Sequence, residues 1–184
     1  SCAVTEGDAL KHPWESLDGE KVAGNLPYNI ASRLIWDLAG RGAGMALGVF
    51  MVQHEVALRL TSGPGGKEYG ALGAWVLNFC RTRYAFKVPP TAFSPRPKVD
   101  SAVVEIIPRP GAERPADPAA LAGILKHCFQ FRRKQMGTIL RAFDPGAVAD
   151  WFAATNIPPQ SRPEVVSPEA FRLLSQSLGK RFST

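Results

Sequence analysis

The sequence has no apolar run long enough to cross a bilayer, and no basic segment followed by an apolar one at its start. It therefore predicts neither a membrane span nor a secreted protein. Cysteine is also scarce: Cys2, Cys80 and Cys128 lie far apart, form no CxxC pair and have no histidine at metal-ligand spacing. We expect reduced thiols, no metal site and a cytoplasmic location.

Acidic residues are fewer than basic ones, 16 against 22, and the formal net charge is +6. The imbalance is local, because residues 1–108 hold 11 basic and 10 acidic side chains whereas residues 109–184 hold 11 and 6. A basic C-terminal region suggests a polyanionic partner, most simply nucleic acid. A solvated basic surface would have the same balance, so charge by itself leaves both interpretations open.

A Gly-rich turn directly after a strand is missing from the sequence, although nucleotide-binding α/β sheets usually carry one. Gly40, Gly42 and Gly44 follow a helical stretch and precede a strand, which is the wrong order for a phosphate cradle. The glycines of residues 63–66 also follow a helical stretch. The first set is interpreted as a helix C-terminus and the loop after it, and the second set fails as a phosphate cradle in the same way.

The first 108 residues alternate short apolar runs with helical patterns, which indicates βαβ units and a mainly parallel sheet. We expect strands at residues 21–24, 46–52, 84–88 and 102–107, and helices at residues 31–39, 53–61 and 71–79. A proline-rich connection with no helical pattern, residues 89–98, joins the last two strands. These two strands can therefore pair antiparallel at one edge.

Residues 109–116 are rich in proline, glycine and charge, as is typical of a linker, and the pattern beyond them is wholly helical. Asp117-Pro118 and Ser167-Pro168 each place a helix-capping residue before a proline at the first helical position. Apolar residues then recur at helical spacing. We expect an α/β domain at residues 1–108 and a small all-α domain at residues 117–184.

Residues 22–30 are interpreted as a strand that ends in a proline-stiffened turn and enters a helix. Ligands of open α/β sheets lie outside the carboxyl ends of the strands, which places Asn25, Leu26, Pro27 and Tyr28 at the ligand edge. The Asn25 amide oxygen and the Leu26 carbonyl can each accept a hydrogen bond from an exocyclic adenine amine and hold its nitrogen for in-line attack. Pro27 has no competing N–H, and Tyr28 offers a flat face for the base. A plain turn is the alternative interpretation of this tetrapeptide.

Together with residues 97–101 (Pro-Lys-Val-Asp-Ser), the Asn-Leu-Pro-Tyr turn makes the sequence resemble the KsgA-type small-subunit rRNA adenine dimethyltransferases. The resemblance extends over residues 6–10, 24–30, 50–56, 67–70, 88–104, 129–134 and 162–164. It implies an α/β fold, a partial Rossmann-like methyltransferase sheet followed by a small all-α C-terminal domain. The implied methyl donor is S-adenosyl-L-methionine, and the implied activity is dimethylation of adenine N6 in small-subunit (16S) rRNA during ribosome biogenesis.

The resemblance also assigns roles to single residues. It implies that Asp8 contacts the adenine of S-adenosylmethionine, that Asn25 lines both cofactor and target, and that Phe93 packs on the flipped target base. The implied contacts to rRNA phosphates are Arg132, Arg133 and Lys134. Simpler interpretations are a loop-capping Asp8, a core-packing Phe93 and a solvated or domain-docking basic helix face.

Members of this family begin with a segment that carries the Gly-rich cofactor turn, whereas this chain opens at residues 1–4, which resemble the strand before Asp8. We therefore expect a truncated methyltransferase domain that is inactive by itself. Two alternatives stay open: a large-subunit rRNA dimethylase of the macrolide-resistance type, and a non-catalytic RNA-binding or assembly protein. Residues 67–70 and 97–101 favour the small-subunit type.

Overall fold

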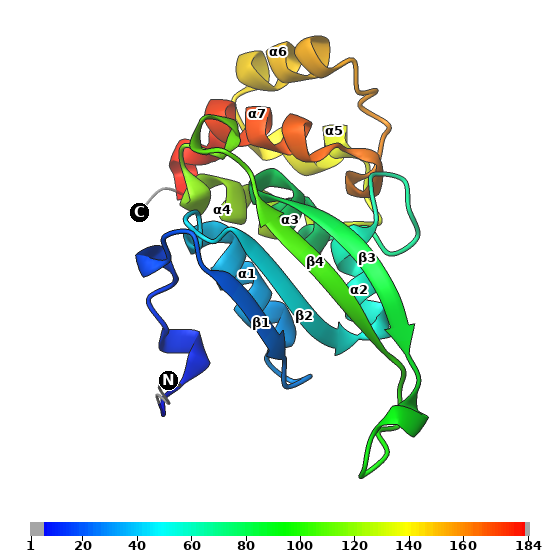
Figure 1. The fold of residues 1–184 in the computed structure, drawn as a ribbon. Coiled ribbons are helices and arrows are strands. Elements are labelled where there is room, and N and C mark those ends of the chain that lie inside the picture. Colours follow the sequence, from blue (N-terminus) through cyan, green and yellow to red (C-terminus); the bar gives the residue numbers. More distant parts are fainter. Residues whose placement is uncertain (1–5, 183–184) are drawn as a thin grey trace.

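The computed structural model describes residues 6–182, in which a four-stranded sheet is followed by an all-helical region (Figure 1). The strand expected at residues 1–4, and Cys2 with it, lie outside the described residues. The α/β class with a helical C-terminal part is confirmed.

The sheet has the strand order β1-β2-β4-β3. Its strands are β1 (Lys21–Asn25), β2 (Leu47–Gln53), β3 (Cys80–Val88) and β4 (Ser101–Pro108). β1 and β2 pair in parallel, and β4 lies antiparallel to both of its neighbours. The antiparallel pairing of the last two strands is therefore confirmed. The expectation of a mainly parallel sheet holds for strand direction, since β3 runs in the same direction as β1 and β2. Only the β1–β2 pairing is parallel, because β4 returns without a crossover α-helix and inserts between β2 and β3.

Three helices cover one face of the sheet: α1 (Ala31–Arg41), α2 (His54–Thr61) and α3 (Ala71–Phe79) (Figure 1). They pack on the alternate strand residues that point to their side, such as Phe50 and Val52 of β2, both buried. Between the helices, the Trp36 and Trp75 rings stack at 4.2 Å. This packing fixes the strand ends that carry the connecting turns.

The carboxyl ends of β1, β2 and β3 lie at one edge of the sheet, far from the helical region (Figure 1). The turn from β1 into α1 emerges at this edge. The β3–β4 connection, with the short helix η3 (Pro90–Ala92), extends beyond it. The fold therefore places the turn that contains Pro27 and the proline-rich β3–β4 connection on the same side.

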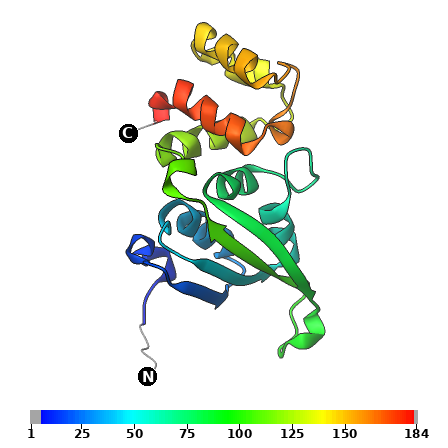
Figure 2. The same cartoon turned by 45° about the horizontal axis from the view of Figure 1, so that its top comes forward.

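The helical region consists of α4 (Pro118–Gln130), α5 (Met136–Ile139), α6 (Pro145–Thr155) and α7 (Pro168–Leu178), with α6 farthest from the sheet (Figure 2). The expected caps are confirmed, because the Asp117 side chain accepts from Ala120 N at 2.8 Å and Ser167 Oγ from Ala170 N at 3.1 Å. The interpretation of the two glycine sets is also confirmed, because Gly42 caps the end of α1 and residues 63–66 follow α2.

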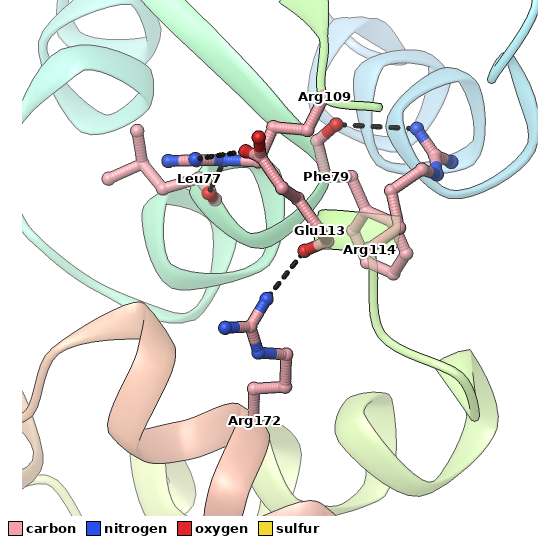
Figure 3. A network of polar contacts seen from close by, with 6 residues as sticks. All are labelled: Leu77, Phe79, Arg109, Glu113, Arg114 and Arg172. Carbon is pink, nitrogen blue, oxygen red and sulfur yellow. Dashed lines mark hydrogen bonds and ion pairs between the residues drawn. The ribbon is translucent and has the colours of Figure 1, made fainter. Parts of the chain in front are cut away.

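Three arginines, which we call the junction arginines (Arg109, Arg114 and Arg172), join the sheet to the helical region (Figure 3). Arg114 donates to the carbonyls of Phe79, Ala39 and Gly40, and Arg109 donates to that of Leu77. Arg172 of α7 donates to the carbonyl of Glu113. The buried apolar core is also continuous across this junction, and the domain boundaries at 108, 116 and 117 stay a prediction.

Candidate active site

The Asn25–Tyr28 turn is held at both of its ends by backbone hydrogen bonds. Leu26 N donates to Met51 O at 3.0 Å and so continues the β1–β2 ladder by one residue. The Pro27 carbonyl accepts from the N–H groups of Ile30 and Ala31, at 3.1 and 3.0 Å, which starts α1. The Asn25 side chain is exposed at the strand end, and Pro27 contributes no N–H of its own.

The five residues predicted to be catalytic line one cavity of about 330 Å³: Asn25, Leu26, Pro27, Tyr28 and Phe93. Pro95 and Pro97 complete its wall. The first four come from the turn after β1, and the other three come from the β3–β4 connection. Tyr28 is the only titratable side chain in this lining, so the cavity suits a reaction that depends on orientation rather than on a strong base.

Ser101 ties the two walls of this cavity together. Its Oγ lies 2.6 Å from the Tyr28 hydroxyl, and its side chain is fully buried at the start of β4. Because Ser101 pairs with Gln53 of β2 and Val88 of β3, it is fixed from both sides. Sequence reasoning missed this residue. It lies within the Pro-Lys-Val-Asp-Ser segment, but nothing in the sequence pairs it with Tyr28.

Asp8 lies in a different part of the molecule. It caps the short helix η1 (Ala9–Lys11), accepting from Leu10 N at 3.0 Å, and it lines a second cavity of about 610 Å³. The linings of the two cavities share no residue, so Asn25 lines only the first. The interpretation of Asp8 as a loop cap is confirmed. Its contact with the cofactor stays a prediction, with which its place in the lining of a cavity is compatible.

The second cavity is lined by residue types that can hold an adenine ring. Trp14, Leu17 and Val22 supply apolar walls for a flat ring, and Asp8 supplies a carboxylate that can accept from an exocyclic amine. The indole N–H of Trp14 is buried and, among the described residues, has no hydrogen-bond partner. A buried unpaired donor of this kind is costly to the protein itself.

The basic cluster Arg132, Arg133 and Lys134 lies in the turn that follows α4, rather than on a helix face, and all three side chains are exposed. Arg132 forms an ion pair with Glu164 at 3.6 Å. The Lys134 ammonium lies 5.0 Å from the centre of the Phe131 ring. The cluster is accessible to a large polyanion.

Within residues 6–182, no helix has the length and apolar content of a membrane span. In the same range, no three His, Cys, Asp or Glu side chains gather as they would around a metal ion. Burial raises the pKa of both described thiols, Cys80 and Cys128, to about 12. They are therefore protonated, unreactive core residues near neutral pH.

Comparison with solved structures supports the fold class. A dimethyladenosine transferase from Plasmodium falciparum superimposes with a TM-score of 0.75 and 25% sequence identity, over 94% of this chain and 70% of that one. The 23S rRNA methyltransferase ErmE superimposes with a TM-score of 0.61 over 91% of this chain and 70% of its own. ErmE is 21% identical, so that likeness concerns the fold alone.

Comparison with curated sequences is more specific. The "Ribosomal RNA small subunit methyltransferase A" of Maridesulfovibrio salexigens is 51% identical over 178 residues, which are 95% of this chain and 67% of that protein. The protein of the same name from Lawsonia intracellularis is 48% identical over 170 residues, 92% of this chain and 63% of its own length. The chain thus spans about two thirds of these relatives. The family model for ribosomal RNA adenine dimethylases matches residues 4–180, and the chain belongs to this family.

Proposed function

We propose that this chain is part of an enzyme that dimethylates adenine N6 in small-subunit rRNA, with S-adenosyl-L-methionine as the methyl donor. The observation that carries the proposal is the cavity in which the Asn25–Tyr28 turn faces Phe93. The names of the curated relatives favour the small subunit. The large-subunit alternative has only the fold likeness to ErmE, and no observation favours a purely non-catalytic role.

An adenine amine is a poor nucleophile because its lone pair is delocalised into the ring. We propose that the Asn25 amide oxygen and the Leu26 carbonyl each accept one of its N–H bonds, and so favour a pyramidal nitrogen that points at the methyl group. The exposed Asn25 side chain in the lining of the cavity supports this role. Holding the reacting atoms in line supplies most of the rate enhancement. No strong base is needed, because the amine proton becomes acidic once the methyl group is attached.

Tyr28 and Phe93 form the proposed clamp for the extruded base. Extruding a base costs a few kcal/mol, and stacking on an aromatic ring returns about 1–3 kcal/mol per contact. Two rings can therefore offset the extrusion. The Tyr28–Ser101 hydrogen bond supports this assignment, because it limits the positions that the Tyr28 ring can adopt.

S-adenosylmethionine, when bound, supplies the methyl group. We assign its adenine to the cavity lined by Asp8 and Trp14, where the carboxylate accepts from the exocyclic amine. The family resemblance also implies a cofactor contact for Asn25. The exposed cluster Arg132, Arg133 and Lys134 is the proposed rRNA contact of the helical domain, residues 117–184, which residues 109–116 link to the methyltransferase domain. The proposed compartment is the cytoplasm, where ribosomal subunits are assembled.

The test is methyl incorporation into isolated small and large ribosomal subunits by an intact enzyme that contains this chain, since the chain by itself is expected to be inactive. We expect incorporation into small subunits, with a loss of at least tenfold for Tyr28→Ala and a smaller loss for Tyr28→Phe, which keeps the ring but removes the bond to Ser101. A matched control is Tyr84→Phe, because Tyr84 also has a polar partner, His54 Nδ1 at 3.2 Å, but lies outside the cavity. Equal turnover of wild type and Tyr28→Ala would contradict the clamp, and incorporation into large subunits alone would contradict the substrate.

A further inference from the structure

A third cavity, a polar groove of about 370 Å³, lies where the α2–α3 connection meets the end of α4. Three cations from three separate segments line it: Arg59 from the last turn of α2, Lys67 from the connection, and Arg132 from the turn after α4. One carboxylate, that of Glu68, also lies in the lining, so cations outnumber acidic groups there by three to one. We call Arg59, Lys67 and Arg132 the groove cations. Two of them belong to the sheet part of the chain, so the basic surface is not confined to the helical region.

The α2–α3 connection is anchored to the helical region, so the groove is formed before any ligand arrives. Gly65 N donates to Glu164 O at 2.7 Å, and the Tyr69 hydroxyl donates to Val166 O at 3.0 Å. Tyr69 is fully buried, and burial raises the pKa of its hydroxyl, which therefore stays a donor. A ligand would gain from this preorganisation, because the cations need little ordering.

The groove cations are available to an anion. Lys67 is exposed and has no ion pair among residues 6–182. Arg59 pairs with Glu55 and Arg132 with Glu164, but both arginine side chains are about half exposed, at 48% and 58%. Exposed pairs of this kind contribute little energy, so a phosphate can replace either carboxylate at small cost.

The surroundings of the groove match a nucleic acid strand. Phe129 lines the groove and packs edge-on against Tyr69, with ring centres 6.2 Å apart, so an aromatic ring lies beside the cations. Beyond Arg132, the exposed Arg133 and Lys134 continue the positive surface. A row of cations with an aromatic ring beside it suits the backbone and bases of a single strand.

We propose that this groove binds the phosphodiester backbone of the RNA that carries the target adenine, with Arg59 and Lys67 as contacts in addition to the Arg132–Lys134 cluster. The inference rests on the proposed rRNA function and deepens it, since the RNA would contact both the sheet part and the helical region. The junction arginines also line a cavity, of about 480 Å³, but they bind backbone carbonyls and carry no such proposal.

The experiment measures binding of a fluorescein-labelled single-stranded RNA by anisotropy over a range of salt concentrations. The double variant Arg59→Gln/Lys67→Gln should lower the salt slope by roughly 1.4, because each lost phosphate contact on a single strand removes about 0.7. A matched control is Lys126→Gln, which removes an exposed cation from α4 outside the groove and should leave the slope unchanged. Circular dichroism checks that the exposed substitutions preserve the fold.

The possible outcomes distinguish a failure of the groove proposal from a failure of the proposed rRNA function. Loss of slope in Arg133→Gln/Lys134→Gln but not in the groove double variant would overturn the groove proposal and leave the rRNA function standing. A wild-type chain that binds no RNA would contradict both. Displacement of the RNA by inorganic phosphate at concentrations too low to screen charge would show a site for a small free anion, and would overturn the assignment to an RNA backbone.

Discussion

The junction arginines and the groove cations are both clusters of three basic side chains. The junction arginines bind backbone carbonyls of the protein itself, whereas the groove cations are available to a ligand. The Arg114 guanidinium donates hydrogen bonds to three backbone carbonyls and also lies 4.9 Å from the centre of the Phe79 ring. The groove cations are instead exposed, and none of them binds a backbone carbonyl within the described part of the chain. Burial lowers the pKa of Arg114, as expected for a desolvated charge. Sequence-based counts of basic residues cannot separate these two roles.

The largest effect should come from the junction. Arg114→Ala leaves the carbonyls of Ala39, Gly40 and Phe79 without their donor, and we expect it to lower the free energy of unfolding by about 3 kcal/mol. Urea denaturation of the variant beside Lys126→Ala measures the difference. If Arg114→Ala were neutral, or if it changed the RNA salt slope of the folded protein, the distinction between the two clusters would fail.

The next effect is a loss of stability at alkaline pH. Burial beside the junction raises the pKa of Cys80 from 9.0 to about 12, so the thiolate forms more readily in the unfolded chain. The stability due to the buried thiol is complete below about pH 9 and falls by about 1.4 kcal/mol per pH unit as the pH rises towards 12. Urea denaturation between pH 8 and 11 measures this slope. The slope should be shallower in Cys80→Ala, and an identical slope in both proteins would indicate a hydrated junction.

The groove cations should show the reverse pattern. Lys67→Ala removes an exposed side chain that has no ion pair among the described residues, so the free energy of unfolding should change by less than about 0.5 kcal/mol. The RNA salt slope should nevertheless fall by about 0.7. Denaturation and anisotropy on the same preparation give both numbers. A destabilisation comparable to that of Arg114→Ala would mean that Lys67 has a structural role.

The smallest effect is a gain. Glu55→Gln removes the carboxylate that pairs with Arg59, so the guanidinium becomes free for a phosphate. We expect RNA affinity to rise about twofold at low salt, because an exposed pair contributes well under 1 kcal/mol. Anisotropy at low ionic strength can resolve this change. Weaker binding in Glu55→Gln would mean that the ion pair orients Arg59 for the RNA rather than competing with it.

The helices, caps and turns of this protein were predictable because they depend on neighbours in sequence. Asp117 and Ser167 cap the helices that follow them, as expected of short polar side chains before a proline. The Asn25–Tyr28 turn likewise lies where a strand gives way to a helix. The insertion of β4 between β2 and β3 was not predictable in the same way, because strand order depends on pairing between distant segments.

The sequence by itself determined the chemistry of the candidate site. Its functional groups are the amide, the carbonyl, the proline and the aromatic ring of the Asn-Leu-Pro-Tyr turn, and these come from four consecutive residues. Only the tertiary structure decided that Phe93 faces this turn, that buried Ser101 bonds to Tyr28, and that Lys67 lies with Arg132 in one groove. The physical reason is the distance along the chain over which each interaction acts. Local conformation follows from steric and hydrogen-bonding preferences within a few residues, whereas these contacts join segments tens of residues apart that meet only when the sheet and the helices bury a common core.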